Sequence, residues 1–243
     1  GAIWYQGESN GKEGVTYFHK KRALIEGWRK LWGQGDFPFY FVQLANFRKP
    51  TIEPGIDNEW ATVQNQQRLT LGYPRTGMAV INDIGEENDI HPKNKKDPGE
   101  RLARWALAKD YGHDLIYCGP LYKSSEVVDG SMRVTFRHSG AGLSSRNDGK
   151  LQRFEIAGKD RVWHWAAAEV EGPDSVLVRS SDVPAPVAVI DGREIKGRAL
   201  VLEVIAPEEQ DVAILSISVD RQEVYLMQPF TVSLTILVKA LPE

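Results

Sequence analysis

Cysteine is almost absent from this chain of 243 residues, because Cys118 is the only one. A single thiol cannot form a disulfide within the chain. This fits a reducing compartment, although many secreted enzymes also lack disulfides. Long apolar runs are absent too, since the longest, such as residues 37–45, are far too short to cross a bilayer. No secretory signal peptide is visible, and we predict no association with a membrane.

The chain also lacks an excess of charge of either sign. Its 30 Lys and Arg residues nearly balance 33 Asp and Glu residues, which leaves a net charge of -3. Binding to nucleic acid usually requires a basic patch, so we predict no nucleic-acid partner. Apolar residues make up 42% of the chain, as in an ordinary globular protein, and the length suits one large domain or two small ones.

The sequence begins at Gly1 without a methionine and enters an apolar strand at once. A buried strand needs neighbours on the sheet, and natural domains rarely begin inside one. We therefore expect Gly1 to be a truncation or processing point, with a further part of the protein upstream.

Residues 1–118 alternate between apolar strands and amphipathic helices. Such alternation is typical of an α/β fold, in which a parallel sheet is covered by helices on both faces. In the first helix the apolar positions recur mostly at steps of three and four residues, which predicts one core-facing stripe. These positions are Phe18, Leu24, Ile25, Trp28, Leu31 and Trp32. The predicted strands are residues 2–5, 39–44 and 77–81, the predicted helices are residues 17–32, 60–71 and 97–111, and residues 46–58 read as a loop.

The pattern changes after Gly119-Pro120. Two short strands flank Asp129-Gly130, which is a hairpin signal, and more short strands follow. Residues 119–189 are therefore predicted to be a β-rich accessory region. Residues 190–243 contain apolar stretches but show no turn pattern that relates them to the rest, so they stay unassigned.

Asp89 and His91 form the first cluster with chemical potential. They follow a predicted buried strand, where α/β folds place their ligand sites. A histidine acts as a general base when a nearby carboxylate fixes its tautomer. The alternative is a loop histidine held by its neighbour without a catalytic role. A metal site is disfavoured, because no other histidine has a spacing that relates it to His91.

Residues 6–10, Gln-Gly-Glu-Ser-Asn, form the second cluster, at the end of another strand. A Gln6 amide beside the Gly7 N–H could stabilise a developing oxyanion, and Glu8 could orient a histidine as well as Asp89 could. Alternatively, these polar side chains only cap the next helix. Residues 7–11 also match G-x-S-x-G, which would make Ser9 a nucleophile upstream of Asp89 and His91. Enzymes with that motif usually place the acid and the histidine on different loops.

The two clusters together resemble the sialate O-acetylesterase family. The resemblance is carried by Gly-Ala-Ile-Trp-Tyr-Gln-Gly-Glu-Ser-Asn at residues 1–10 and by Asp-Ile-His-Pro-Lys-Asn-Lys at residues 89–95. This family is a branch of the SGNH hydrolases related to carbohydrate esterases that act on acetylated xylan. Short segments similar to those of the family lie at residues 28–29, 43–45, 60–61, 99–103 and 119–122. The resemblance extends to about Val189, after which the family's usual ending is not found.

The resemblance implies a flavodoxin-like three-layer α/β/α domain that lacks its N-terminal part. It also implies deacetylation of an O-acetylated sugar such as sialic acid without a metal or other cofactor, and a secreted or periplasmic location. The family's nucleophilic serine lies in a Gly-Gln-Ser-Asn-Met type motif, which this chain lacks, so the serine would lie upstream of Gly1. His91 would be the base, and Gln6, Gly7 and Asn10 would serve the oxyanion and the substrate.

The acid partner of His91 departs from the family pattern. SGNH enzymes generally place the acid three residues before the histidine, where this chain has Asn88. Asp89 stands one residue closer, and Glu8 is its rival. The leading prediction is thus a carbohydrate O-acetylesterase fragment that carries the catalytic histidine and is inactive by itself. The alternatives are a self-sufficient hydrolase that uses Ser9, or a non-catalytic carbohydrate-binding module.

Overall fold

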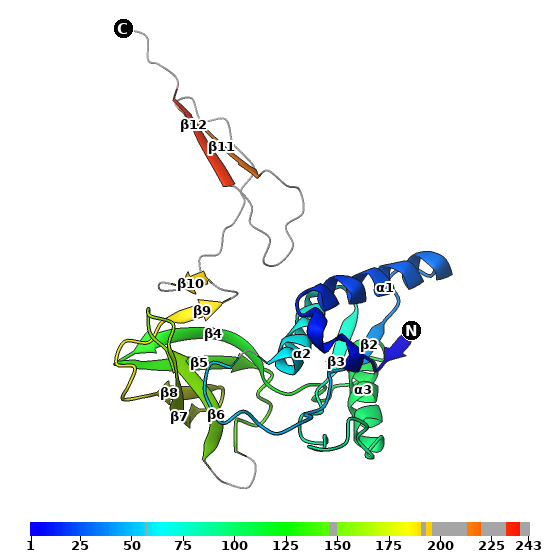
Figure 1. The fold of residues 1–243 in the computed structure, drawn as a ribbon. Helices are drawn as coiled ribbons and strands as arrows, with labels where there is room; N and C mark the ends of the chain where they lie inside the picture. The colour runs from blue at the N-terminus through cyan, green and yellow to red at the C-terminus, as the bar shows by residue number, and fades with distance from the viewer. Residues whose placement is uncertain (57, 146–149, 191–192, 196–212, 220–231, 239–243) are drawn as a thin grey trace. The chain divides into compact units, whose positions relative to one another are not determined.

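A computed structural model describes residues 1–56, 58–145, 150–190, 193–195, 213–219 and 232–238 (Figure 1). The chain divides into two compact units, Gly1–Ala188 and Val189–Glu243. Within the described ranges, no helix combines the length and the apolar character that crossing a membrane requires.

Three parallel strands form the first sheet of the Gly1–Ala188 unit. β1 (Ala2–Trp4), β2 (Phe39–Val42) and β3 (Thr76–Ala79) lie side by side in that order. Every side chain of β2 is buried, because β2 has a strand on each side and helices over each face. The predicted parallel sheet is therefore confirmed, and its three carboxyl ends meet at one edge.

Three α-helices connect and cover these strands. They are α1 (Thr16–Trp32), α2 (Glu59–Leu69) and α3 (Lys96–Lys109), and two short 3-10 helices, η1 (Glu8–Glu13) and η2 (Thr70–Gly72), accompany them. Asn58 caps α2, since its side-chain oxygen accepts the N–H of Trp60 at 2.9 Å. α2 ends two residues before the predicted end at Leu71, because the chain tightens into η2 ahead of Gly72 and Pro74.

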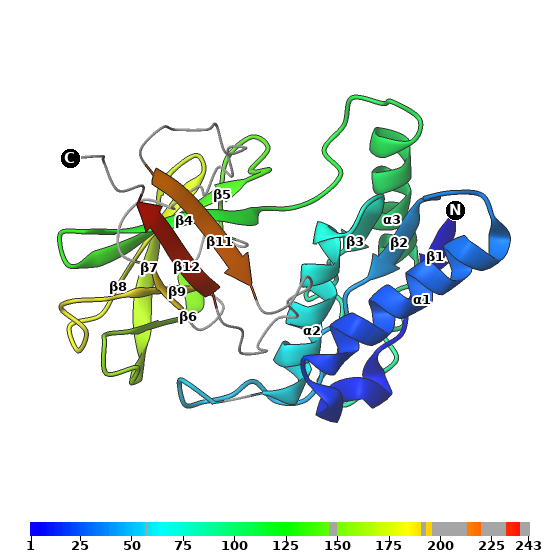
Figure 2. The same cartoon turned by 90° about the horizontal axis from the view of Figure 1, so that it is seen from above.

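The helices form layers on opposite faces of the sheet (Figure 2). On one face, Phe39, Phe41 and Met78 pack against Ile25 of α1. On the other face, the core residues of the sheet pack against α3. This second cluster consists of Tyr40, Val42, Ala45, Ala79 and Ile81 from the sheet and the segments that follow it, and Leu102 and Trp105 from α3. The predicted three-layer α/β/α arrangement is thus confirmed.

The stripe of α1 that faces the sheet differs from the predicted one. Its buried residues are Tyr17, Lys21, Ile25 and Arg29, spaced four residues apart. Leu31 and Trp32 were expected in the core, but they are 79% and 47% exposed. The prediction was wrong at this end because it followed apolar character alone, whereas two long cationic side chains occupy the buried stripe.

A five-stranded antiparallel sheet follows in the same unit. Its order is β4-β5-β8-β7-β6, and Asp129-Gly130 turns the chain between β4 and β5 with positive φ angles of 47° and 73°. This geometry is the two-residue hairpin that the sequence predicts. The strands are β4 (Leu121–Val128), β5 (Ser131–Arg137), β6 (Leu151–Ala157), β7 (Trp163–Gly172) and β8 (Ser175–Arg179).

The later part of the chain contributes two further strand pairs. β9 (Ala188–Ile190) pairs with β10 (Arg193–Ile195), and β11 (Ala213–Val219) pairs with β12 (Val232–Val238). The last two strands are antiparallel, with Ala213 opposite Val238. The unassigned region therefore includes the end of β9 and all of β10, β11 and β12, and its other residues lie outside the described ranges.

Candidate functional site

The candidate site lies at the carboxyl edge of the parallel sheet. The segments that leave β1, β2 and β3 there begin at Tyr5, Gln43 and Val80. In parallel α/β sheets, ligands bind at this edge because loops, rather than strands, present the side chains. Both predicted clusters follow this rule, since residues 6–10 come after β1 and residues 89–91 belong to the segment after β3.

Two glutamines of α2 join the three strand ends. The Gln67 side chain accepts the N–H of Leu44 at 2.8 Å and donates to the carbonyl of Gln6 at 3.2 Å. The Gln64 side chain donates to the carbonyl of Leu44 at 2.8 Å and to Asn82 Oδ1 at 3.0 Å. These side chains give hydrogen-bond partners to backbone groups that have none within the sheet. One helix thus fixes the carboxyl edge of the sheet.

The sequence reasoning missed both glutamines. The available signal was the run Val63-Gln64-Asn65-Gln66-Gln67, which places amides at helix positions that a core-facing stripe would give to apolar residues. Gln67 is fully buried, and a buried amide is stable only when its polar atoms have partners. Polar residues on the core face of a helix therefore pointed to a bonded network.

We expect Gln67→Leu to lower the free energy of unfolding by about 1–3 kcal/mol, because the buried Leu44 N–H would lose its acceptor. Urea denaturation followed by circular dichroism measures this change. Asn65→Ala, on the exposed side of the same helix, is the matched control and should change stability far less. Equal stability of Gln67→Leu and the parent chain would contradict the structural role given to this amide.

Gln6, Gly7 and Asn10 lie in the segment that follows β1. The Gln6 side chain donates to Asn10 Oδ1 at 2.5 Å, and the Asn10 amide donates to Glu13 Oε2 at 2.8 Å. Gly7 is buried with a φ of 148°, and a methyl group there would lie 3.1 Å from both Gln67 Nε2 and Tyr17 Oη. A side chain at position 7 would thus be strained and crowded, which explains the glycine.

Asp89 and His91 also lie together, on an exposed segment. Asp89 Oδ1 accepts the backbone N–H of His91 at 2.9 Å and lies 3.8 Å from its Nδ1. The first contact is an Asx turn, and the second is too long for a hydrogen bond. The His91 side chain is 83% exposed, so it is accessible to a substrate.

Glu8, the rival acid, belongs to the neighbourhood of β1. Burial, and then the charge of Glu8, raise the pKa of Tyr5. In turn, the Tyr5 ring lies 5.8 Å from Lys95 Nζ, in the segment that follows His91. Across the described residues, no hydrogen bond or ion pair joins Glu8 to His91, so Asp89 is the carboxylate in contact with the histidine.

Ser9 lies exposed in η1. Over the part of the chain that the structure describes, no serine, threonine or cysteine side chain forms a hydrogen bond with His91. The same part of the chain holds no group of three or more His, Cys, Asp or Glu residues arranged to bind a metal ion. The candidate site therefore presents an exposed histidine with a carboxylate beside it, together with an edge of oriented amides.

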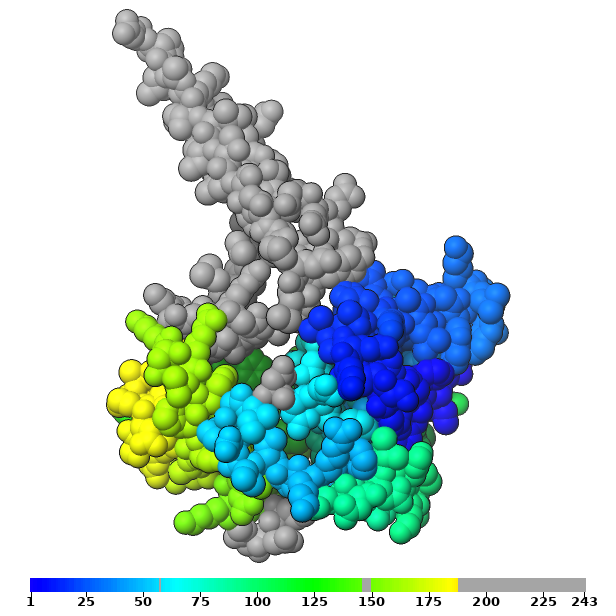
Figure 3. All heavy atoms as spheres, viewed as in Figure 1, coloured from blue at the N-terminus to red at the C-terminus, as the bar shows by residue number. Residues whose placement is uncertain are grey.

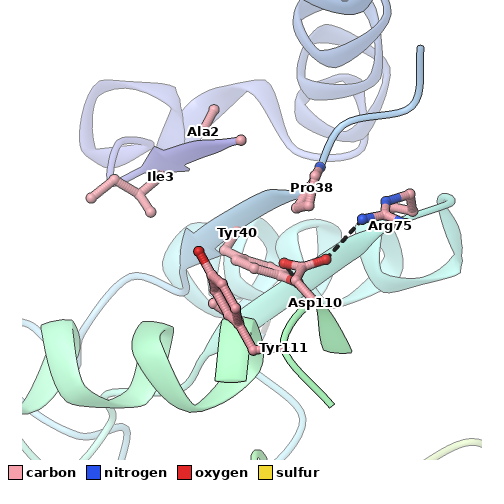
Figure 4. A pocket seen from close by; sticks show the side chains of 9 residues that line it. Ala2, Ile3, Pro38, Tyr40, Arg75, Asp110 and Tyr111 are labelled. Atoms are coloured by element: carbon pink, nitrogen blue, oxygen red, sulfur yellow. Dashed lines mark hydrogen bonds and ion pairs between the residues drawn. The ribbon is translucent and has the colours of Figure 1, made fainter. Parts of the chain in front are cut away.

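A separate cavity of about 380 Å³ lies at the opposite, amino end of the strands (Figure 4). Ile3, Tyr40 and Tyr111 contribute to its walls. Asp110 accepts a hydrogen bond from Tyr40 at 2.7 Å and forms an ion pair with Arg75 at 2.8 Å. Burial and the contact with Asp110 raise the pKa of Tyr40, so its hydroxyl stays protonated. This cavity is distant from both predicted clusters along the strands, and it is not the candidate site.

Comparison with known proteins gives the relationships of the chain. No family model matches it. The sialate O-acetylesterase of Mus musculus is 32% identical over 190 residues, which cover 70% of this chain and 34% of that protein. The sialate O-acetylesterase of Homo sapiens is 31% identical over 157 residues, which cover 56% of this chain and 29% of that protein. The crystal structure of a carbohydrate acetylesterase from Xanthomonas citri matches with a TM-score of 0.71 and 42% identity, over 77% of this chain and 43% of that one.

The fold and the edge that carries the clusters define an SGNH-like α/β domain. The resemblance to the sialate O-acetylesterase family that the two motifs predict is confirmed by these matches. It spans about a third of the length of the curated relatives that it matches.

Proposed function

We propose that this chain is the histidine-bearing part of a carbohydrate O-acetylesterase, which removes acetyl groups from an O-acetylated sugar such as sialic acid. The observation that carries the proposal is the match to the Xanthomonas citri carbohydrate acetylesterase, at 42% identity and a TM-score of 0.71. The names of the mouse and human relatives support sialic acid as the sugar. The exposed His91 at the carboxyl edge supplies a group that fits this chemistry.

The proposed reaction is acyl transfer through a serine. The serine oxygen attacks the acetyl carbonyl carbon while His91 takes the hydroxyl proton, and a tetrahedral intermediate forms. The bond from the carbonyl carbon to the sugar oxygen then breaks as His91 returns the proton to that oxygen. Water attacks the acetyl-enzyme in the same way, so the serine is restored and acetate leaves.

Asp89 is the proposed partner of His91. Its Oδ1 accepts the backbone N–H of His91 at 2.9 Å, and a hydrogen bond to Nδ1 requires the two side chains to approach more closely than their present 3.8 Å. The carboxylate would then stabilise the imidazolium that forms during attack. Gln6, Gly7 and Asn10 are the proposed groups for the oxyanion and the substrate, with Gln67 fixing the backbone of Gln6.

We propose that the nucleophilic serine comes from a segment N-terminal to Gly1. Three observations support this source. Among the described residues, β1 pairs with β2 alone, and Ile3 of β1 is 72% exposed. An open, apolar strand edge favours addition of another strand. The relatives are also about three times as long as the matched region.

The test measures acetate release from p-nitrophenyl acetate and from an O-acetylated sialic acid. The 243-residue chain is compared with the longer polypeptide that includes the upstream segment. We expect activity from the longer polypeptide and none above background from the chain alone. Activity of the chain alone that is lost in Ser9→Ala would instead assign the nucleophile to Ser9. Sugar binding without hydrolysis by either protein would favour a carbohydrate-binding module.

A further inference from the structure

The segment of residues 46–56 connects the candidate site to the antiparallel sheet. It leaves the carboxyl end of β2 and leads towards α2. In Figure 3 its light-blue surface lies against the yellow-green surface of the strands β6 and β7. The segment has no regular secondary structure of its own, so its position depends on what holds it.

Three side chains of β6 and β7 hold the segment through its backbone. Arg153 donates to the carbonyl of Thr51 at 2.6 Å, and Trp165 Nε1 donates to the carbonyl of Ile52 at 3.1 Å. Glu155 accepts the N–H of Gly55 at 2.9 Å. These three partners are 100 to 113 residues away in sequence, so the contacts are tertiary.

The fit at Gly55 is close as well. Its φ is +73°, and a methyl group there would lie 3.0 Å from the Cβ of Trp163. Only glycine adopts this conformation without strain while allowing the tryptophan to approach. The segment is therefore held by packing in addition to its hydrogen bonds.

The other end of the segment contacts the residues that lead to His91. The N–H of Arg48 donates to the carbonyl of Glu87 at 3.0 Å. Gly85 lies so close to Asn46 that a methyl group at position 85 would be 2.0 Å from the Asn46 carbonyl oxygen. Residues 85–87, which end two residues before Asp89, thus pack directly against residues 46–48.

We propose that Arg153, Glu155 and Trp165 are positioning residues of the esterase site. They fix residues 46–56, and these in turn fix residues 85–91, so that the antiparallel sheet sets the place of His91. This inference rests on the proposed function for its catalytic consequence, but the mechanical link stands on the contacts alone. A base must be held close to its productive position, because a displacement of about 1 Å can cost on the order of 100-fold in rate.

The first test uses hydrogen exchange on the 243-residue chain, so it does not depend on activity. The double variant Arg153→Ala/Trp165→Phe removes two donors from the segment and keeps an aromatic ring at position 165. We expect peptides from residues 46–56 and also from residues 85–91 to exchange about tenfold faster, with α1 and β5 unchanged. Faster exchange in residues 46–56 alone would overturn the proposal, and so would faster exchange throughout the unit.

The control is Arg179→Ala, which removes an arginine from the same sheet. Arg179 lies 3.3 Å from Glu169 in an exposed ion pair and makes no described contact with residues 46–56. Its exchange pattern should match that of the parent chain. Arg153→Lys, combined with the native Trp165, keeps a cationic donor near Thr51 and should restore most of the protection of residues 85–91.

The second test measures kinetics in the longer polypeptide. We expect the double variant to lower kcat for an O-acetylated sugar about tenfold and to leave KM within about twofold, because the base is displaced while the substrate groups at β1 are not. A rise in KM at constant kcat would overturn the positioning role. If the parent polypeptide itself releases no acetate, the proposed function fails, and the exchange result still decides the mechanical link.

Discussion

Replacing His91 with alanine in the longer polypeptide is expected to lower kcat for an O-acetylated sugar by about 10²–10⁴-fold. The loss follows from its proposed role, since a positioned general base contributes a factor of this size. Initial rates of acetate release, measured at saturating substrate, give kcat directly. The stability of the protein should not change, because the His91 side chain is 83% exposed and its described side-chain contact is a long one with Asp89.

The acid partner is settled by a matched pair of variants. Asp89→Asn and Glu8→Gln each remove one carboxylate charge at nearly constant size. Because Asp89 is the carboxylate in contact with His91, we expect Asp89→Asn to cause the larger loss of kcat. A larger loss in Glu8→Gln would transfer the role to Glu8. Full activity of His91→Ala would refute the proposed base altogether.

Replacing Lys21 with methionine is expected to raise the free energy of unfolding by about 1–3 kcal/mol. Lys21 is 3% exposed, and its Nζ has no hydrogen-bond partner among the described residues. The Nζ lies over the Phe41 ring, 3.2 Å from the ring centroid, which offsets part of the cost of burial. Methionine fills a similar volume without a charge. Urea denaturation at neutral pH measures the difference.

The stability of the parent chain should also rise with pH, and this rise should be smaller in Lys21→Met. Burial lowers the pKa of Lys21 well below its ordinary value. At pH values between this lowered pKa and the pKa of the same lysine in the unfolded chain, the unfolded state binds more protons than the folded state does. The free energy of unfolding therefore increases with pH over this range. Burial raises the pKa of Tyr17, so below about pH 10 this neighbouring tyrosine stays protonated in both states.

Lys20→Met is the control for both measurements. Lys20 is the preceding residue of α1, but its side chain is 59% exposed and pairs with Glu13 at 2.7 Å. Its replacement should change stability by less than about 1 kcal/mol and leave the rise of stability at neutral and alkaline pH intact. The contact with Lys20 lowers the pKa of Glu13, so any effect of its loss on the pH dependence falls in the acid range. Destabilisation in Lys21→Met would mean that the contact with Phe41 outweighs the cost of burial.

Local sequence patterns were sufficient to predict the elements that carry the site. The strands after Gly1, Pro38 and Arg75 are short apolar runs, and their ends carry the polar clusters at residues 6–10 and 89–91. Both signals are local, because the position of a strand and of its ends follows from the apolar period. The fold class could therefore be predicted, whereas the choice between Asp89 and Glu8 as the partner of His91 could not.

Tertiary contacts account for what the sequence could not predict. Gln67 is recognisable as a link between two strand ends only after α2 has been placed across them. The contact of Arg153 with Thr51 joins residues 102 positions apart, and no periodicity encodes it. The burial of Lys21 is a third case, because charged residues are rarely buried without a partner and nothing in the sequence marks this one as an exception. Each case depends on which surfaces meet, which a pattern in one chain does not specify.

The two bridging amides of α2 also constrain how this scaffold can change over generations. Gln64 and Gln67 lie on one rigid helix and reach the ends of β1 and β2 and the turn after β3. A shift of that helix would move all three together, so a mutation there alters the whole edge at once.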